Sequence, residues 1–145
     1  MNPRDLEKWS FYWSELRLMI AAIALLLGGV PPILFVVATM PGLYGLASML
    51  LKLSWIISGA SAVYLAYLWF IHKWKVFGSD DKMDMVAFGV MVISGLNLGF
   101  AGLAGTNLGM SITSNHIVFI LVALLYLWAG FYLWKRWGKH GKHLF

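Results

Sequence analysis

The sequence predicts an all-α membrane protein with four transmembrane helices and both termini in the cytoplasm. Of the 145 residues, 61% are hydrophobic and only 12% are charged, about half the charged share of an average soluble domain. Four apolar runs are long enough to cross the hydrocarbon core, which takes about 20 residues. Lys and Arg gather on one side of these runs. A soluble fold of this size could not bury so much apolar surface.

The expected spans are the runs 18–38, 47–71, 83–104 and 117–134. They are too long and too uniformly apolar for barrel strands, which alternate in character and need about 10 residues each. Their interiors hold no Asp, Glu or Arg except Asp84 at an edge, which we expect to belong to the neighbouring loop. Proton- and cation-coupled carriers usually place a carboxylate inside a span, so the pattern disfavours that class.

The spans divide the chain into a cytoplasmic interfacial N-terminus (1–17), a first helical hairpin (18–71), a cytoplasmic loop (72–82), a second hairpin (83–134) and a basic cytoplasmic tail (135–145). Ten of the eleven Lys and Arg lie in the N-terminus, the loop and the tail, and Lys52 is the exception. The positive-inside rule makes their side cytoplasmic. Because the net charge of +5 flanks the spans and forms no separate patch, we expect no nucleic-acid partner.

The two hairpins resemble each other in sequence. Met85 and Gly95 in the second hairpin keep the spacing of Met19 and Gly29 in the first. Because both hairpins enter from the same side, the halves form a parallel repeat about an axis along the membrane normal.

The run SGLNLGFAGL at 94–103 resembles the motif G-x-L-N-W-G-L-x-G-L of a family of small bacterial and archaeal two-helix membrane proteins, catalogued as a domain of unknown function. The resemblance is closer in 83–134 than in 18–69, where Pro31 and Pro32 replace Asn97 and Leu98. It implies a tandem duplication of the two-helix unit in a prokaryotic cytoplasmic membrane. It implies no activity.

Small residues recur along the third span at steps of three and four. They are Gly95, Gly99, Gly102, Thr106 and Gly109. This spacing lines one face of a helix, and small residues there let two helix backbones approach closely. We expect a helix-packing face, with a narrow groove for a lipid or quinone tail as the alternative.

A second group of residues forms a candidate polar site within the membrane. Its members are Pro31, Pro32, Asn97, Asn107, Ser58 and Ser61. Proline removes a backbone donor and clashes with the preceding turn, so the pair predicts a kink or break in the first span. A buried amide needs partners, and serines of the second span or a freed carbonyl could supply them. Structural support is the plain interpretation, and contact with an ion or substrate is the alternative.

The sequence shows no catalytic set. It has no cysteine, no Ser-His-Asp combination, no phosphate loop and no metal-ligand cluster. His72 and His116 are expected at opposite membrane surfaces, and Asn115 before His116 resembles a helix N-cap. We therefore expect no enzymatic activity of the chain alone, no metal and no cofactor.

These observations favour a non-catalytic structural or accessory subunit of a homo-oligomer or a larger membrane complex. Its expected partners are the lipid bilayer and either copies of itself or other membrane subunits. One alternative is a small channel or transporter with a site near Pro31, Pro32 and Asn97. Another is a subunit that holds a lipid or quinone in a respiratory or oxidase-type complex.

Overall fold

The computed structural model describes residues 2–145 as helices joined by short connections. The helices are α1 (Pro3–Leu26), α2 (Pro32–Val37), α3 (Pro41–Ile71), α4 (Lys82–Ala104), α5 (Leu108–Ile112) and α6 (His116–Lys139). Four of them, α1, α3, α4 and α6, are long and apolar enough to cross a membrane. The all-α class and the presence of four helices that could span a membrane are therefore confirmed.

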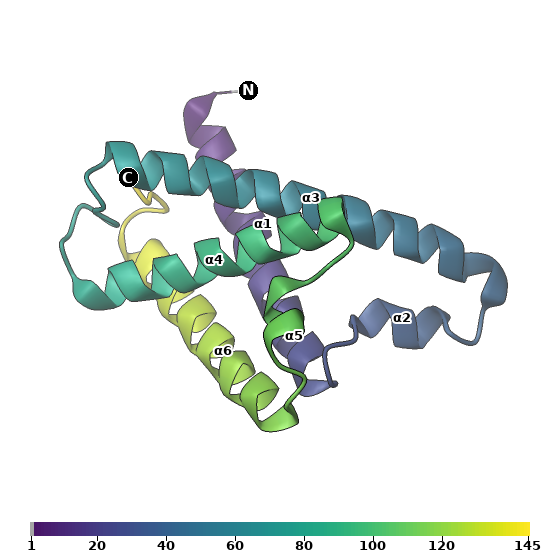
Figure 1. Ribbon diagram of the computed structural model, residues 1–145. Helices are drawn as coiled ribbons and strands as arrows, with labels where there is room; N and C mark the ends of the chain where they lie inside the picture. Colours follow the sequence, from purple (N-terminus) through teal and green to yellow (C-terminus); the bar gives the residue numbers. More distant parts are fainter. Residues whose placement is uncertain (1) are drawn as a thin grey trace.

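The four long helices pack as two pairs that also contact each other. In Figure 1, α3 and α4 run side by side in opposite directions, and α1 and α6 lie across them. The most extensive packing joins α3 to α4 and α1 to α6. The closest packing thus runs between the expected hairpins 18–71 and 83–134, and less of it lies within them.

The first long helix begins earlier than the sequence predicts. It runs from Pro3 to Leu26 without a break, well beyond the predicted start at residue 18, and the assignment of residues 1–17 to the membrane interface stays a prediction. The Asn2 side chain accepts a hydrogen bond from the Arg4 N–H at 3.3 Å, as an N-cap should. Pro3 suits the first turn because its missing N–H would have no helical partner there.

The same helix ends before the two prolines. Gly28 and Gly29 have φ values of 81° and 88°, a left-handed conformation that glycine adopts without strain. Pro31 then caps α2, and Pro32 is its first residue. The kink or break expected in the run 18–38 is therefore observed as a break, which begins at the glycine pair just before the prolines.

The starts of α4 and α6 follow local capping rules. Asp81 accepts a hydrogen bond from the Met83 N–H at 2.8 Å at the start of α4. Asn115 accepts one from the Ile117 N–H at 2.9 Å at the start of α6, which confirms the N-cap expected before His116. His116 itself is exposed.

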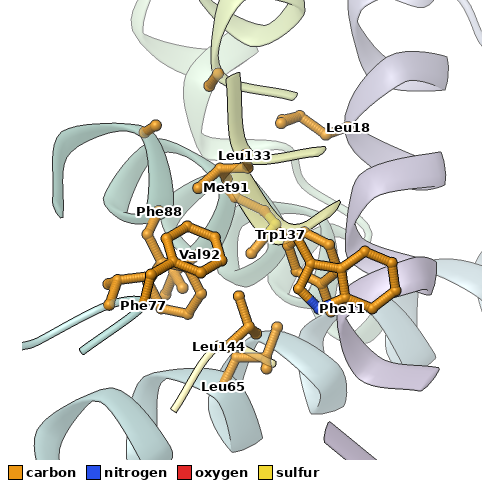
Figure 2. Packing of buried hydrophobic residues seen from close by; sticks show 13 residues of the cluster. Phe11, Leu18, Leu65, Phe77, Phe88, Met91, Val92, Leu133, Trp137 and Leu144 are labelled. Carbon is orange, nitrogen blue, oxygen red and sulfur yellow. The ribbon is translucent and has the colours of Figure 1, made fainter. Parts of the chain in front are cut away.

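The hydrophobic core lies toward the end of the molecule where α3 and α6 finish (Figure 2). The Phe11 ring packs on the Trp137 ring with centroids 5.0 Å apart. The Phe77 N–H donates to the Leu144 carbonyl at 2.6 Å, and the Leu144 N–H donates to the Glu7 carboxylate at 2.8 Å. The beginning of α1, the α3–α4 connection and residues 140–145 therefore meet at one end.

The outer faces of the long helices are strongly apolar. Leu103 is 75% exposed, and Ile93, Ile117 and Phe131 are each more than 65% exposed. Water would be a poor solvent for such a surface, and lipid a good one. The exposed faces and the four candidate spans together indicate an integral membrane protein.

Candidate binding cavity

Helices α3 and α4 approach so closely that glycine is needed at their contact. A Cβ atom added to Gly99 would lie 2.5 Å from the Gly59 Cα, and one added to Gly95 would lie 2.6 Å from the Ala62 Cβ. A Cβ added to Gly102 would meet Ile56 at 2.9 Å. Three of the five residues expected to form a packing face therefore contact α3 of the same chain.

The other two residues of the expected face lie elsewhere. Gly105 has a φ of 74° and caps α4, so Thr106 lies in the following connection, exposed. Gly109 belongs to α5, with its nearest contact at Asn107. The expectation that all five residues line one helix is therefore wrong for Thr106 and Gly109.

Asn97 and Asn107 bind each other. The Asn97 side-chain N–H donates to the Asn107 Oδ1 at 2.9 Å, and the Gly109 N–H donates to the Asn97 Oδ1 at 3.3 Å. Asn107 also accepts from the Met110 N–H at 3.2 Å, which caps α5. The expectation that serines of the second span bind these amides is wrong. The turn after Gly105 brings Asn107 back to α4, where it binds Asn97.

The expected serines have other surroundings. Ser58 is buried, accepts a hydrogen bond from the Trp13 indole N–H at 3.0 Å and donates to the Ser54 carbonyl at 2.7 Å. It thereby joins α3 to α1. Ser61 is half-buried.

All six helices contribute to a cavity of about 730 Å³. Five of the six residues of the candidate polar site line it, namely Pro31, Pro32, Ser58, Asn97 and Asn107. Ser61 is not among the lining residues. Most of the wall is aliphatic or aromatic, from residues such as Ile20, Ile33 and Phe119. A mostly apolar cavity with a few polar groups is typical of small-molecule sites.

Arg17 lines this cavity although only 6% of its surface is exposed. One terminal nitrogen, Nη1, donates to the Ser94 Oγ at 2.9 Å, and the other, Nη2, donates to the Met91 carbonyl at 2.9 Å. Its Nε is buried and has no partner among residues 2–145. Helix α1 carries Arg17 into the packed part of the molecule, and the assignment of residues 1–17 to a cytoplasmic interfacial segment stays a prediction.

Glu15 is buried on the opposite side of α1, where it faces α6. It is 4% exposed, and its Oε1 has no hydrogen-bond partner in the described chain. A Cβ added to Gly130 would lie 3.3 Å from the Glu15 Oε2, so glycine makes room for the carboxylate. Glu15 also lines a second hollow, of about 780 Å³, with aromatic neighbours that include Tyr12 and Trp134.

Asp84 is fully buried in the first turn of α4. It accepts hydrogen bonds from the Tyr132 hydroxyl at 2.9 Å and from the Arg136 Nε at 2.7 Å. The Arg136 Nη2 donates to its second oxygen. The expectation that Asp84 belongs to a loop is wrong, because a two-pronged ion pair with α6 satisfies its charge.

The buried charges of α1 could have been found from helical spacing. Phe11, Ser14 and Leu18 are buried at steps of three and four, a periodicity that extends the first helix toward the N-terminus. The hydrogen bonds of Asp84 could have been anticipated from the topology. Asp84 and Arg136 lie at the ends of two spans, and these ends were expected on the same side of the membrane.

No family model, no curated protein and no solved structure matches this chain. The resemblance to the two-helix family therefore stays a prediction. Among residues 2–145, no three His, Asp or Glu side chains lie together as a metal site would require.

Proposed function

We propose that this chain is a non-catalytic integral membrane protein that holds an amphiphilic molecule, of the lipid or quinone class, among its helices. The observation that carries the proposal is the cavity of about 730 Å³. Its size falls in the range of about 300–1,000 Å³ that small-molecule sites occupy. Its apolar wall suits a hydrocarbon chain, and Arg17, Ser94 and Tyr126 add polar groups.

Membership of a homo-oligomer or of a larger respiratory or oxidase-type complex stays a prediction. Part of its support came from the glycine face of the third span. Because α3 covers Gly95, Gly99 and Gly102, these glycines serve a contact within the chain and no longer support an interface with another subunit. Native mass spectrometry of the mildly extracted protein would test the prediction, and a monomer without other subunits would contradict it.

Transport of a small solute is a second candidate function, supported by Pro31, Pro32 and Asn97 lining one cavity. The Asn97 amide is already bonded to Asn107 and Gly109, which leaves it less free to bind a solute. For that reason we favour the holding function. Liposomes that contain the protein and show no solute flux would exclude transport.

We further infer that the chain lies in a prokaryotic cytoplasmic membrane as a parallel repeat of two hairpins, with both termini in the cytoplasm. The distribution of Lys and Arg supports this orientation. The hydrogen bonds that bring together Glu7, Phe77 and Leu144 are compatible with it, because they hold segments near both ends of the chain against each other.

The proposed function is tested by filling the cavity with a larger side chain. Ala24 lines the cavity on α1, so Ala24→Phe should exclude an occupant. Ala60 is exposed on α3 and does not line the cavity, so Ala60→Phe is a matched control. Native mass spectrometry and lipid extraction should find a bound amphiphile in the wild type and the control, and little in Ala24→Phe. Equal occupancy in all three proteins would refute the proposal.

A further inference from the structure

We propose that the cavity selects an amphiphile with an acidic headgroup, a carboxylate or a phosphate, and that Arg17 binds this headgroup. The inference rests on the proposed function and adds the chemical class of the ligand.

Arg17 has more donors than the protein satisfies. A guanidinium group carries five N–H donors, and the bonds to Ser94 and Met91 use two of them. Nε is enclosed and unpartnered, so a ligand would bind through Nη1 and Nη2. Guanidinium groups suit this role because their planar donors match the oxygens of carboxylates and phosphates.

Arg17 forms no ion pair within residues 2–145, although the Glu15 carboxylate interacts with its charge at longer range. The ion pairs within residues 2–145 are Lys75–Asp80 and Arg136–Asp84. Burying a charge is costly unless an opposite charge or several hydrogen bonds compensate it. An acidic headgroup in the cavity would supply both the charge and the missing acceptors.

Glu15 does not fill this role although it precedes Arg17 by two residues. Side chains two positions apart on a helix do not face each other. Glu15 packs beside Gly130 of α6, whereas a Cβ added to Gly95 of α4 would lie 3.0 Å from the Arg17 Nη2. The two charges therefore point to different helices, and only Arg17 lines the cavity of about 730 Å³.

The rest of the cavity suits the apolar part of such a molecule. Ile20, Ile33 and Phe119 line it together with Arg17. Tyr126 is also in the wall and carries a hydroxyl that can donate to a headgroup oxygen. The wall thus provides a cationic group and an apolar surface for one molecule.

The test compares ligands that have the same hydrocarbon chain and differ in the charge of the headgroup. Detergent-purified, delipidated full-length protein is titrated with a long-chain fatty acid and with its methyl ester at alkaline pH, and complexes are counted by native mass spectrometry. We expect the acid to bind about tenfold or more tightly than the ester, because a charge-assisted hydrogen bond is lost in the ester. Arg17→Gln should remove this preference.

Two further variants separate ligand binding from structural support. Ser14→Ala changes a buried side chain of α1 that does not line the cavity and keeps the charge of Arg17, so it should preserve the preference for the acid. Arg17→Lys keeps a charge without the planar donors and should bind the acid with reduced preference over the ester. If Arg17→Gln does not fold, the wild-type comparison and Arg17→Lys still decide the matter.

The outcomes distinguish the inference from the function on which it rests. Equal binding of acid and ester by the wild type overturns the inference and leaves the holding function standing. Binding of neither, together with an empty cavity in the extracted protein, overturns both. Parallel titrations with phosphatidylglycerol and phosphatidylcholine identify the headgroup source, and a phosphatidylglycerol preference that Arg17→Gln abolishes supports the inference for a phosphate.

Discussion

Asp84 shows how a single buried charge is stabilised in this chain. Its two oxygens accept hydrogen bonds from Tyr132 and from two nitrogens of Arg136. Removing one partner of a buried ion pair is much more costly than removing an exposed pair, because the remaining charge stays desolvated. The side chain of Asp84 therefore connects the start of α4 to the end of α6.

We expect Asp84→Ala to lower the free energy of unfolding by about 2–4 kcal/mol, slightly less than for a fully buried pair. The expected loss is smaller than for a fully buried pair because the Arg136 side chain is 25% exposed and keeps part of its hydration. Thermal unfolding in detergent measures the effect.

Asp80→Ala is the matched control for this prediction. Asp80 pairs with Lys75 at 3.3 Å, but its side chain is 76% exposed. Such pairs contribute about 0–1 kcal/mol, so the control should unfold close to the wild-type temperature. Equal destabilisation by the two variants would contradict the structural role of Asp84.

At the scale of elements, the contact between α3 and α4 depends on glycine in both helices. The added Cβ atoms at Gly59 and Gly99 would meet backbone atoms at 2.6 and 2.5 Å. Backbone cannot rotate away as a flexible side chain can, so the helices would have to separate.

We expect Gly99→Ala to destabilise the protein by about 1–3 kcal/mol, the usual cost of overpacking. Gly89→Ala on the same helix is the control, because its Cβ would only touch Trp69 at 3.8 Å. Alanine favours helix over glycine, so the control should be neutral or slightly stabilising. The prediction fails if both variants unfold at the same temperature.

How well each helix could be predicted depends on what hydropathy measures, which is the average polarity along a stretch of sequence. The expected span 83–104 agrees with α4 (Lys82–Ala104) because this run has a clear start at Asp81 and few polar residues. The first helix extends further toward the N-terminus than predicted, because Glu15 and Arg17 were assumed to be solvated and are in fact buried. A property averaged along the sequence cannot reveal that Arg17 bonds to Ser94, 77 residues away.

The candidate site was predicted only in part for the same reason. Prolines and amides inside an apolar run are visible in the sequence, and Pro31, Pro32, Asn97 and Asn107 do line the cavity. The partners of the amides depend on the turn at Gly105, and the cavity depends on how the helices pack. Neither is encoded in a local pattern.

For the whole molecule, the orientation in the membrane can be measured directly. The chain has no cysteine, so single-cysteine variants react at one place only. Thr106 and Lys142 are both exposed, Thr106 in the connection between α4 and α5 and Lys142 in the segment that follows α6. We expect a membrane-impermeant maleimide to label Thr106→Cys in intact cells and Lys142→Cys only in inverted vesicles. The reverse pattern would contradict cytoplasmic termini.

The two opposite charges on α1, Glu15 and Arg17, also affect how the helix inserts into the membrane during synthesis. When α1 leaves the ribosome, Glu15 and Arg17 have no packed neighbours, because α4 and α6 have not yet been synthesised. A charged residue in the middle of a lone helix in lipid costs several kcal/mol. Helix α1 therefore settles fully only after Met91 and Ser94 arrive to accept the hydrogen bonds of Arg17. We therefore expect the two charges of α1 to be fully stabilised only after both α4 and α6 have been made, which would make assembly a late, cooperative event.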